Sequence, residues 1–166
     1  KKSGWAEEDP NQWWNNTLSI LKEISDFAKQ SKIKLCAIGV TGMLPALIIL
    51  DKNNKPIRLS IQQSDSRTEK ELKSIFRNKI QMKNFTKNTK CGINQQLIAP
   101  KILWIKKNEL NNYKKINKIL GSYDFINYKL SGIFNIEHNW ALESGLMEFK
   151  SKSFTPDLLK PVSYTH

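Results

Sequence analysis

Apolar residues recur at intervals of three and four along residues 10–29, with Trp14 and Leu18 among the first. This spacing places them on one face of a helix. Asp9 and Pro10 stand at the start of the pattern. An aspartate there accepts a hydrogen bond from a free amide, and the fixed φ of proline suits the first helical position. The pattern therefore predicts an amphipathic helix over residues 10–29.

Two apolar runs follow, and both favour strands. Residues 34–40, "KLCAIGV", predict a buried strand that ends at Thr41 and Gly42. Residues 44–61, "LPALIILDKNNKPIRLSI", contain two apolar stretches on either side of the polar sequence "DKNNK". Apolar stretches around a short polar turn are typical of a β-hairpin.

Helical patterns dominate the rest of the chain. A helix is expected from Thr68 onward. The sequence "SRTE" before it has the form of a capping box, in which the Ser66 hydroxyl and the Glu69 carboxylate satisfy free amide groups. Residues 80–98 are polar and irregular, with a turn at Cys91 and Gly92. Four further helical segments are expected over residues 100–110, 113–120, 124–131 and 139–149, the second and third stopped by Gly121 and Gly132 and the last either a helix or a turn.

This order of elements predicts the fold class. Strands and helices alternate first, and helices dominate afterwards. Such an order favours an α/β domain with a small mixed sheet and a helix-rich second half. No internal repeat or low-complexity linker divides the chain, so we expect a single, partial domain over residues 1–166.

Composition supports a folded chain. Its 166 residues suffice for one core, and a hydrophobic fraction of 39% with five tryptophans argues against disorder. No apolar run approaches the roughly 20 residues that span a bilayer. Lys1 and Lys2 are not followed by an apolar signal region. We therefore expect a cytoplasmic protein with no membrane partner.

The charge of +12 raises the question of nucleic-acid binding. The basic residues are nearly all lysines, since Arg58, Arg67 and Arg77 are the arginines of the sequence. Recognition of base edges favours arginine, because its guanidinium donates two parallel hydrogen bonds. The lysines are also spread over many segments. The pattern favours a solvated surface, with a basic nucleic-acid-binding protein kept as the less favoured alternative.

The sequence lacks the residues that several kinds of catalytic or binding site require. The histidines are His138 and His166, too few for a catalytic triad, so His138 is expected to be structural or exposed. Cys36 and Cys91 form neither a disulfide framework nor a zinc motif. The seven glycines do not have the spacing of a phosphate-cradling loop. The sequence thus predicts no nucleotide, cofactor or metal site of its own.

One polar cluster has two interpretations. Gln62, Gln63, Asp65 and Arg67 follow an apolar strand, and ligands of α/β proteins bind where strands end. Asp65 accepts hydrogen bonds from hydroxyls, Arg67 donates them, and the two glutamines do both, so the cluster suits a polyol. In the other interpretation, Ser66 caps a helix and Arg67 pairs with a glutamate of that helix. Spacing alone favours the capping interpretation.

Four segments resemble those of one family and occur in its order. "GWAEEDPNQWW" is similar to a Gly-Trp-x-Glu-Gln-Asp-Pro-x-x-Trp-Trp segment. "CAIGVTGMLPALIILDKNNKPIRLSIQQSDSRT" is similar to an Ala-Ile-Gly-Val-Ser-Gly-Gln-Met-His-Gly strand, a hairpin and a Trp-Asn-Asp-x-Arg-Thr segment. "APKILWIKKNE" and "DFINYKLSGIFNIEHNWALESGLMEF" are similar to two later segments. The family is that of the FGGY carbohydrate kinases, which includes xylulokinases and glycerol kinases, and the resemblance covers about residues 4–162.

The resemblance implies a partial actin-like, ribonuclease-H-like domain. It also implies an enzyme that uses ATP and Mg²⁺ to phosphorylate a hydroxyl of a ketose or polyol. The family's catalytic aspartate corresponds to a position beyond residue 166, its phosphate loop to one before residue 1, and its adenine-binding glycines to a C-terminal domain. The resemblance thus implies an internal piece of the N-terminal domain that has no catalytic residue and is inactive alone. Exposed sheet edges then favour self-association.

The resemblance also assigns substrate-binding residues. The family's sugar-contacting Met-His pair corresponds to Leu44 and Pro45, its Asp and Arg to Asp65 and Arg67, and its Trp-Asn to Gln63 and Ser64. The expected substrate-binding residues are therefore Leu44, Pro45, Gln63, Asp65 and Arg67. Leu44, Pro45, Gln63 and Ser64 differ from the family's residues, so the identity of the sugar is left open. We hypothesise that Gln62 and Gln63 replace the polarity lost at Pro45. A stand-alone sugar-binding or regulatory module of the same fold is the main alternative.

Overall fold

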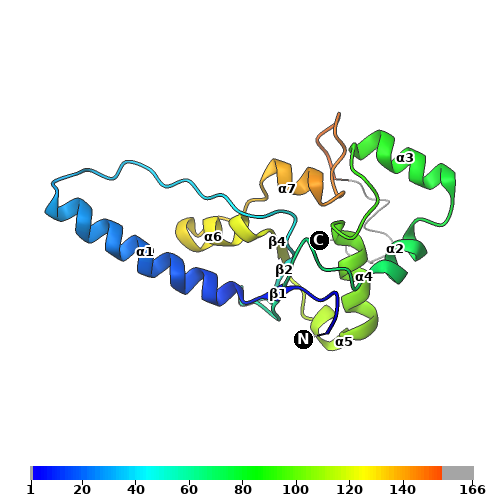
Figure 1. Ribbon diagram of the computed structural model, residues 1–166, viewed down its shortest axis with the longest axis horizontal. Helices are drawn as coiled ribbons and strands as arrows, with labels where there is room; N and C mark the ends of the chain where they lie inside the picture. Colours follow the sequence, from blue (N-terminus) through cyan, green and yellow to red (C-terminus); the bar gives the residue numbers. More distant parts are fainter. Residues whose placement is uncertain (1, 155–166) are drawn as a thin grey trace.

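The computed structural model describes residues 2–154 (Figure 1). Residue 1 and residues 155–166, which include His166, lie outside this described range. Within the described range, helices surround two small antiparallel sheets, which confirms the mixed α/β class. The helices are α1 (Pro10–Gln30), α2 (Glu69–Ile75), α3 (Lys79–Thr89), α4 (Ile98–Asn108), α5 (Leu110–Tyr113), α6 (Ser122–Ser131) and α7 (His138–Glu143). The strands are β1 (Glu7–Glu8), β2 (Ile48–Leu50), β3 (Ser60–Ile61) and β4 (Lys118–Leu120).

The first predicted helix is confirmed as α1. The Asp9 carboxylate accepts a hydrogen bond from the Asn11 amide at 2.9 Å, and Pro10 is the first helical residue. α1 packs against α6 through its first half and then extends away from the rest of the chain (Figure 1). Its far half consequently keeps apolar side chains such as Ile24 and Phe27 exposed.

The predicted strand over residues 34–40 is wrong. This segment is not a strand and is largely exposed, with Ile38 61% accessible. Figure 1 shows it running back from the end of α1 towards β2. An apolar run becomes a strand only where a neighbour hydrogen-bonds to its amides and carbonyls. Within residues 2–154, no strand is paired with this segment.

The predicted hairpin over residues 44–61 is confirmed. Leu47 and Ile61 exchange two backbone hydrogen bonds, of 2.9 and 3.0 Å. The turn is closed by Asp51, whose carboxylate accepts from the amides of Asn53 and Lys55. The two arms then take different partners: β2 pairs with β4, and β3 pairs with β1. The end of β3 is thereby placed beside the N-terminal segment.

Two expectations in the second half are wrong. Residues 113–120 do not form a helix: α5 ends at Tyr113, and β4 pairs with the buried strand β2. Pairing with a buried strand outweighs a short helical pattern. Residues 80–98 are not irregular throughout, because α3 occupies their first half. Phe85 and Thr89 are its buried residues, so the apolar periodicity was too weak to indicate a helix.

The predicted capping box is also wrong. Thr68 occupies the N-cap position of α2 and makes no capping hydrogen bond through its side chain. The Ser66 hydroxyl donates to the Gly4 carbonyl at 3.2 Å, and Glu69 pairs with Lys73 along the helix surface. Ser66 is engaged by the N-terminal segment, which lies more than sixty residues away in sequence.

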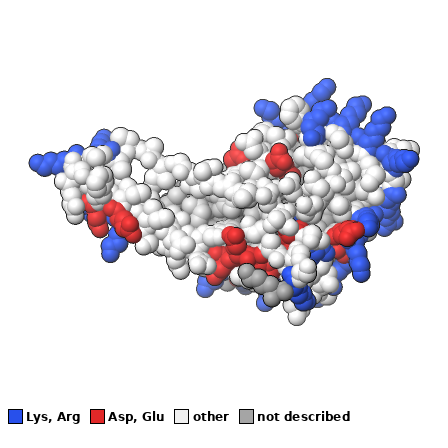
Figure 2. Space-filling view, in the orientation of Figure 1, with Lys and Arg blue, Asp and Glu red and all other residues white. Residues whose placement is uncertain are grey.

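The core lies between the hairpin, α4, α6 and α7. At its centre Trp140 is fully buried, and its indole N–H donates to the Ala46 carbonyl at 2.9 Å. The predicted helix stop at Gly132 is confirmed by its left-handed φ of 74°. No helix among residues 2–154 is both long and apolar enough to cross a bilayer. Figure 2 shows positive side chains gathered towards the end of the molecule that α3 forms.

Candidate functional site

A cavity of about 840 Å³, called the main cavity below, opens where the N-terminal segment, residues 40–43, the end of β3 and the start of α6 meet. Three aromatic residues line it: Trp5, Trp13 and Tyr123. Its polar lining comes from Lys2, Glu7, Glu8, Thr41, Gln62, Gln63, Ser64 and Ser122. Flat aromatic faces pack against C–H groups, and amides and hydroxyls both donate and accept hydrogen bonds. The main cavity therefore suits a small ligand rich in hydroxyls.

Gln63 is the one expected substrate-binding residue in the lining of the main cavity. Its side-chain oxygen accepts a hydrogen bond from the Gln96 amide at 3.1 Å, and its nitrogen lies 3.0 Å from the sulfur of Met43. Gln96 belongs to the loop before α4, so two loops hold this amide. Sequence reasoning missed Gln96, for which the sequence pattern carried no signal.

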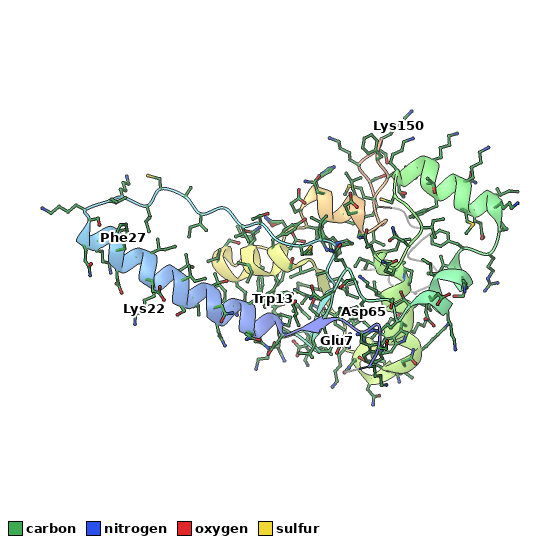
Figure 3. All side chains as sticks on the ribbon, in the orientation of Figure 1. Glu7, Trp13, Lys22, Phe27, Asp65 and Lys150 are labelled. Atoms are coloured by element: carbon green, nitrogen blue, oxygen red, sulfur yellow. The ribbon has the colours of Figure 1, made fainter. Side chains whose placement is uncertain are left out.

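Asp65 and Arg67 lie behind the cavity wall. The exposed fractions of their side chains are 0% and 1%. Arg67 binds Asp65 in a bidentate manner, with Nε–Oδ1 and Nη2–Oδ2 distances of 2.8 and 2.6 Å. Arg67 also pairs with Glu7 at 2.7 Å, and Asp65 accepts from the Ala6 amide at 2.7 Å. Figure 3 shows Glu7 and Asp65 close together near β1. The two residues thus fasten the N-terminal segment to the end of β3.

Two tryptophans enclose the Arg67 guanidinium. Its central carbon lies 3.6 Å from the ring centroid of Trp5 and 4.9 Å from that of Trp104. Both rings attract the cation through their negative faces. Trp5 also lines the main cavity, so the ion pair supports one of its aromatic walls.

The pKa of Asp65 reflects opposing influences. Desolvation, the largest, raises it. Hydrogen bonds from the Arg67 side chain and from the amides of Ala6 and Arg67 lower it, and together they leave the pKa below its ordinary value. The carboxyl is therefore held as a carboxylate at neutral pH.

Leu44 and Pro45 lie outside the lining of the main cavity, directly after Met43, which belongs to it. The peptide bond between them is cis. Leu44 is half-buried and packs against the core, whereas Pro45 is buried. Their side chains are apolar, so their polar contribution to a site comes from the backbone.

A second network supports Tyr123 in the cavity wall. Its hydroxyl donates to Glu137 at 2.8 Å, and burial together with this carboxylate raises the pKa of Tyr123. Asp124 accepts from the amides of Gly121 and Glu137 and so ties the start of α6 to the start of α7. Sequence reasoning missed Tyr123; for Trp5 and Trp13 a signal existed, since both fall in the first of the four segments compared above.

Comparison with known proteins yields one consistent family. The sequence profile described as "FGGY family of carbohydrate kinases, N-terminal domain" matches residues 1–165. The xylulose kinase of Staphylococcus xylosus is 31% identical over 158 residues, which are 95% of this chain and 32% of that protein. The xylulose kinase of Lactococcus lactis is 30% identical over 162 residues. The chain thus spans about a third of the length of these relatives.

Solved structures agree with the sequence matches. The crystal structure of xylulose kinase from Rhodospirillum rubrum is 39% identical and superposes with a TM-score of 0.91, covering 98% of this chain and 33% of that one. Plasmodium falciparum glycerol kinase with ADP is 23% identical, with a TM-score of 0.88, and covers 98% of this chain and 34% of that one. The second likeness shows the fold, which is that of sugar kinases.

Proposed function

Because this chain belongs to the FGGY family of carbohydrate kinases and matches that family's N-terminal domain, we propose that it forms the sugar-binding side of the cleft in an ATP-dependent kinase. That kinase phosphorylates a hydroxyl of a ketose or polyol. The main cavity is the observation that carries this proposal, since its lining combines aromatic faces with hydrogen-bonding side chains, among them amides and hydroxyls. Xylulose is the first candidate substrate, because relatives of 31% and 39% sequence identity are named xylulose kinases.

In this proposal the chain's own residues bind and orient the sugar. Trp5 and Trp13 shield one side of it from water, while Gln63 and Ser64 hydrogen-bond to its hydroxyls. Such positioning lowers the entropy cost of bringing the reacting groups together. Asp65 and Arg67 act from behind the wall, and Leu44 and Pro45 act through their backbone. When bound, ATP with Mg²⁺ supplies the phosphoryl group.

The described residues do not fit the metal that accompanies the nucleotide. Among residues 2–154, no group of three or more His, Cys, Asp or Glu side chains is placed to hold a metal ion. We therefore assign no step of phosphoryl transfer to this chain. We propose that a C-terminal kinase domain is its partner and that the 166-residue chain alone does not turn over ATP.

A substrate screen tests the proposal. A kinase of full family length that carries this chain is incubated with ATP, Mg²⁺ and a panel of pentuloses, hexuloses, glycerol and other polyols, and ADP release is measured. We expect sugar-dependent ADP release that is fastest with a ketopentose. Absence of release with every sugar would contradict the proposal.

A binding titration distinguishes this proposal from a stand-alone sugar-binding or regulatory module. The same panel is titrated against the 166-residue chain while tryptophan fluorescence is recorded. A lone half-site is expected to bind weakly, because the groups that complete it are missing. Tight binding by the chain without turnover in the full-length protein would favour a stand-alone sugar-binding module.

A further inference from the structure

Lys101 of α4 is a fully buried cation beside the main cavity. Its ammonium donates to the carbonyl oxygens of Gln62 at 3.0 Å and of Pro45 and Gln96 at 3.4 Å. An ammonium has three N–H donors, and three carbonyls surround this one. The carbonyls belong to three separate segments: the loop before β2, the residues after β3 and the loop before α4. One atom therefore joins three loops.

Burial of this charge is unfavourable. Lysine is almost never fully buried unless its charge is compensated. Desolvation, the dominant influence, lowers the pKa of Lys101 to about 8, while nearby Asp65 raises it and nearby Arg67 lowers it. Fold stability alone gives little reason for such a residue, because an apolar side chain of similar length avoids the desolvation.

The loops that Lys101 joins carry the polar wall of the main cavity. Gln62 lines the cavity and directly precedes Gln63, which lines it too. Gln96, the third carbonyl partner, donates its side-chain amide to the oxygen of Gln63. Lys101 thus binds the carbonyl of Gln62, which directly precedes Gln63. It also binds the carbonyl of Gln96, whose side chain orients the Gln63 amide.

We propose that Lys101 is a positioning residue of the sugar site: its ammonium fixes the three loops so that Gln62 and Gln63 face the bound sugar. The inference rests on the proposed function, because it assigns the ligand of the main cavity as a sugar. Lys101 itself does not touch the ligand, since the cavity lining does not include it.

Steady-state kinetics of Lys101→Met in a full-length kinase that carries this chain test the inference. Methionine keeps the stem but loses the donors, so the three loops lose their common partner. We expect the KM for the sugar to rise about tenfold or more, since misplacement of positioning groups has effects of this order. The KM for ATP should stay unchanged, and kcat should change far less than the sugar KM.

Lys107→Met is the matched control. Lys107 lies on the same helix but is half exposed and pairs with Glu71. Its loss should leave the sugar KM at the wild-type value. Lys101→Arg keeps a cation and its donors and should recover part of the lost affinity. A folded Lys101→Met variant with the wild-type sugar KM would overturn the inference.

The pH dependence of wild-type affinity provides a second test, which holds even if Lys101→Met fails to fold. As the pH rises through about 8, Lys101 loses a proton and one donor. Asp65 and Arg67, the charged groups that influence it, keep their charges in this range. Sugar affinity, followed by tryptophan fluorescence of the full-length protein, should fall between pH 7 and pH 9. A flat profile would overturn the inference, whereas a wild-type protein that phosphorylates no sugar would overturn the proposed function itself.

Discussion

At the scale of single residues, the Arg67 guanidinium joins the N-terminal segment to the rest of the domain. It contacts two carboxylates and two tryptophan rings and is almost fully buried. Spacing alone could not reveal this role, because Glu7 and Trp5 lie sixty residues earlier. The interpretation in which Arg67 pairs with its own helix is replaced by a long-range pair with Glu7 and a local pair with Asp65.

Replacement of Arg67 by methionine should be strongly destabilising. The change leaves the Asp65 carboxylate buried without its partner, and breaking a buried pair in this way costs about 3–5 kcal/mol. Urea unfolding measures the loss. Arg77→Met is the control, because Arg77 is exposed and donates to the carbonyl of Ser74, near the end of α2. A double variant that also carries Asp65→Asn should lose less than the sum of the two single changes. Additive losses would contradict the coupling.

The stability contributed by Asp65 should vanish in acid. Its pKa in the folded chain lies below the ordinary value, so the folded state favours the carboxylate. The contribution is complete above the ordinary pKa of about 4 and is lost as the pH falls through the lower, folded value. Thermal unfolding between pH 7 and pH 2 checks this. The Asp65→Asn variant should be less stable at neutral pH and should lose less stability on acidification.

Gln63→Ala should raise the sugar KM of a full-length kinase with little change in the free energy of unfolding. The variant removes an amide that lines the main cavity, while Gln96 remains partly open to solvent and can rehydrate. A loss of one hydrogen bond to a ligand corresponds to roughly 1 kcal/mol, or about fivefold in KM. Gln95→Ala, at an exposed neighbouring position, is the control. An unchanged KM would count against Gln63 as a sugar ligand.

At the scale of elements, the start of α6 is packed tightly against α7. A Cβ added to Gly121 would lie 2.5 Å from Cδ1 of Trp140 and 2.8 Å from the carboxylate of Asp124. Trp140 is fully buried, so its ring has no solvent-filled space to move into. The sequence pattern predicted Gly121 at the end of a helix. In the structure it precedes α6, and its lack of a side chain lets α6 and α7 approach closely.

Gly121→Ala should therefore destabilise the domain. Forcing an extra methyl group into a filled core costs about 1–3 kcal/mol. Chemical denaturation measures the change. Gly39→Ala is the matched control, because a Cβ at Gly39 meets no atom within 4 Å. Equal stability of Gly121→Ala and wild type would show that α7 shifts freely relative to α6.

At the scale of the whole molecule, one side remains apolar and uncovered. The far half of α1 and the segment over residues 33–43 expose Ile24, Phe27, Leu35 and Ile38. The extended segment also leaves backbone groups available for pairing with a second copy. Clusters of exposed apolar groups of this kind favour association.

We expect the isolated 166-residue chain to self-associate through residues 33–43, more strongly as salt increases. The charge of +12 repels a second copy, and salt screens that repulsion. Sedimentation velocity at about 50 mM and about 500 mM salt, at the same protein concentration, measures it. Leu35→Lys with Ile38→Lys should keep the chain monomeric. Asn15→Lys with Ser19→Lys, at exposed positions of α1, adds the same charge outside residues 33–43 and serves as the control. A chain that is monomeric under every condition would contradict the expectation.

Local signals made part of this protein predictable. The N-cap of α1, the polar turn of the hairpin and the glycine after α6 act over a few residues, so the sequence determined these elements by itself. The order of four motifs likewise indicated the family. Tertiary contacts decided what those signals could not. β4 exists because β2 pairs with it, residues 34–40 are not a strand because no described strand pairs with them, and Lys101 is buried because three distant loops converge on it. Pairing and burial depend on residues far apart along the chain, and only the folded structure brings these together.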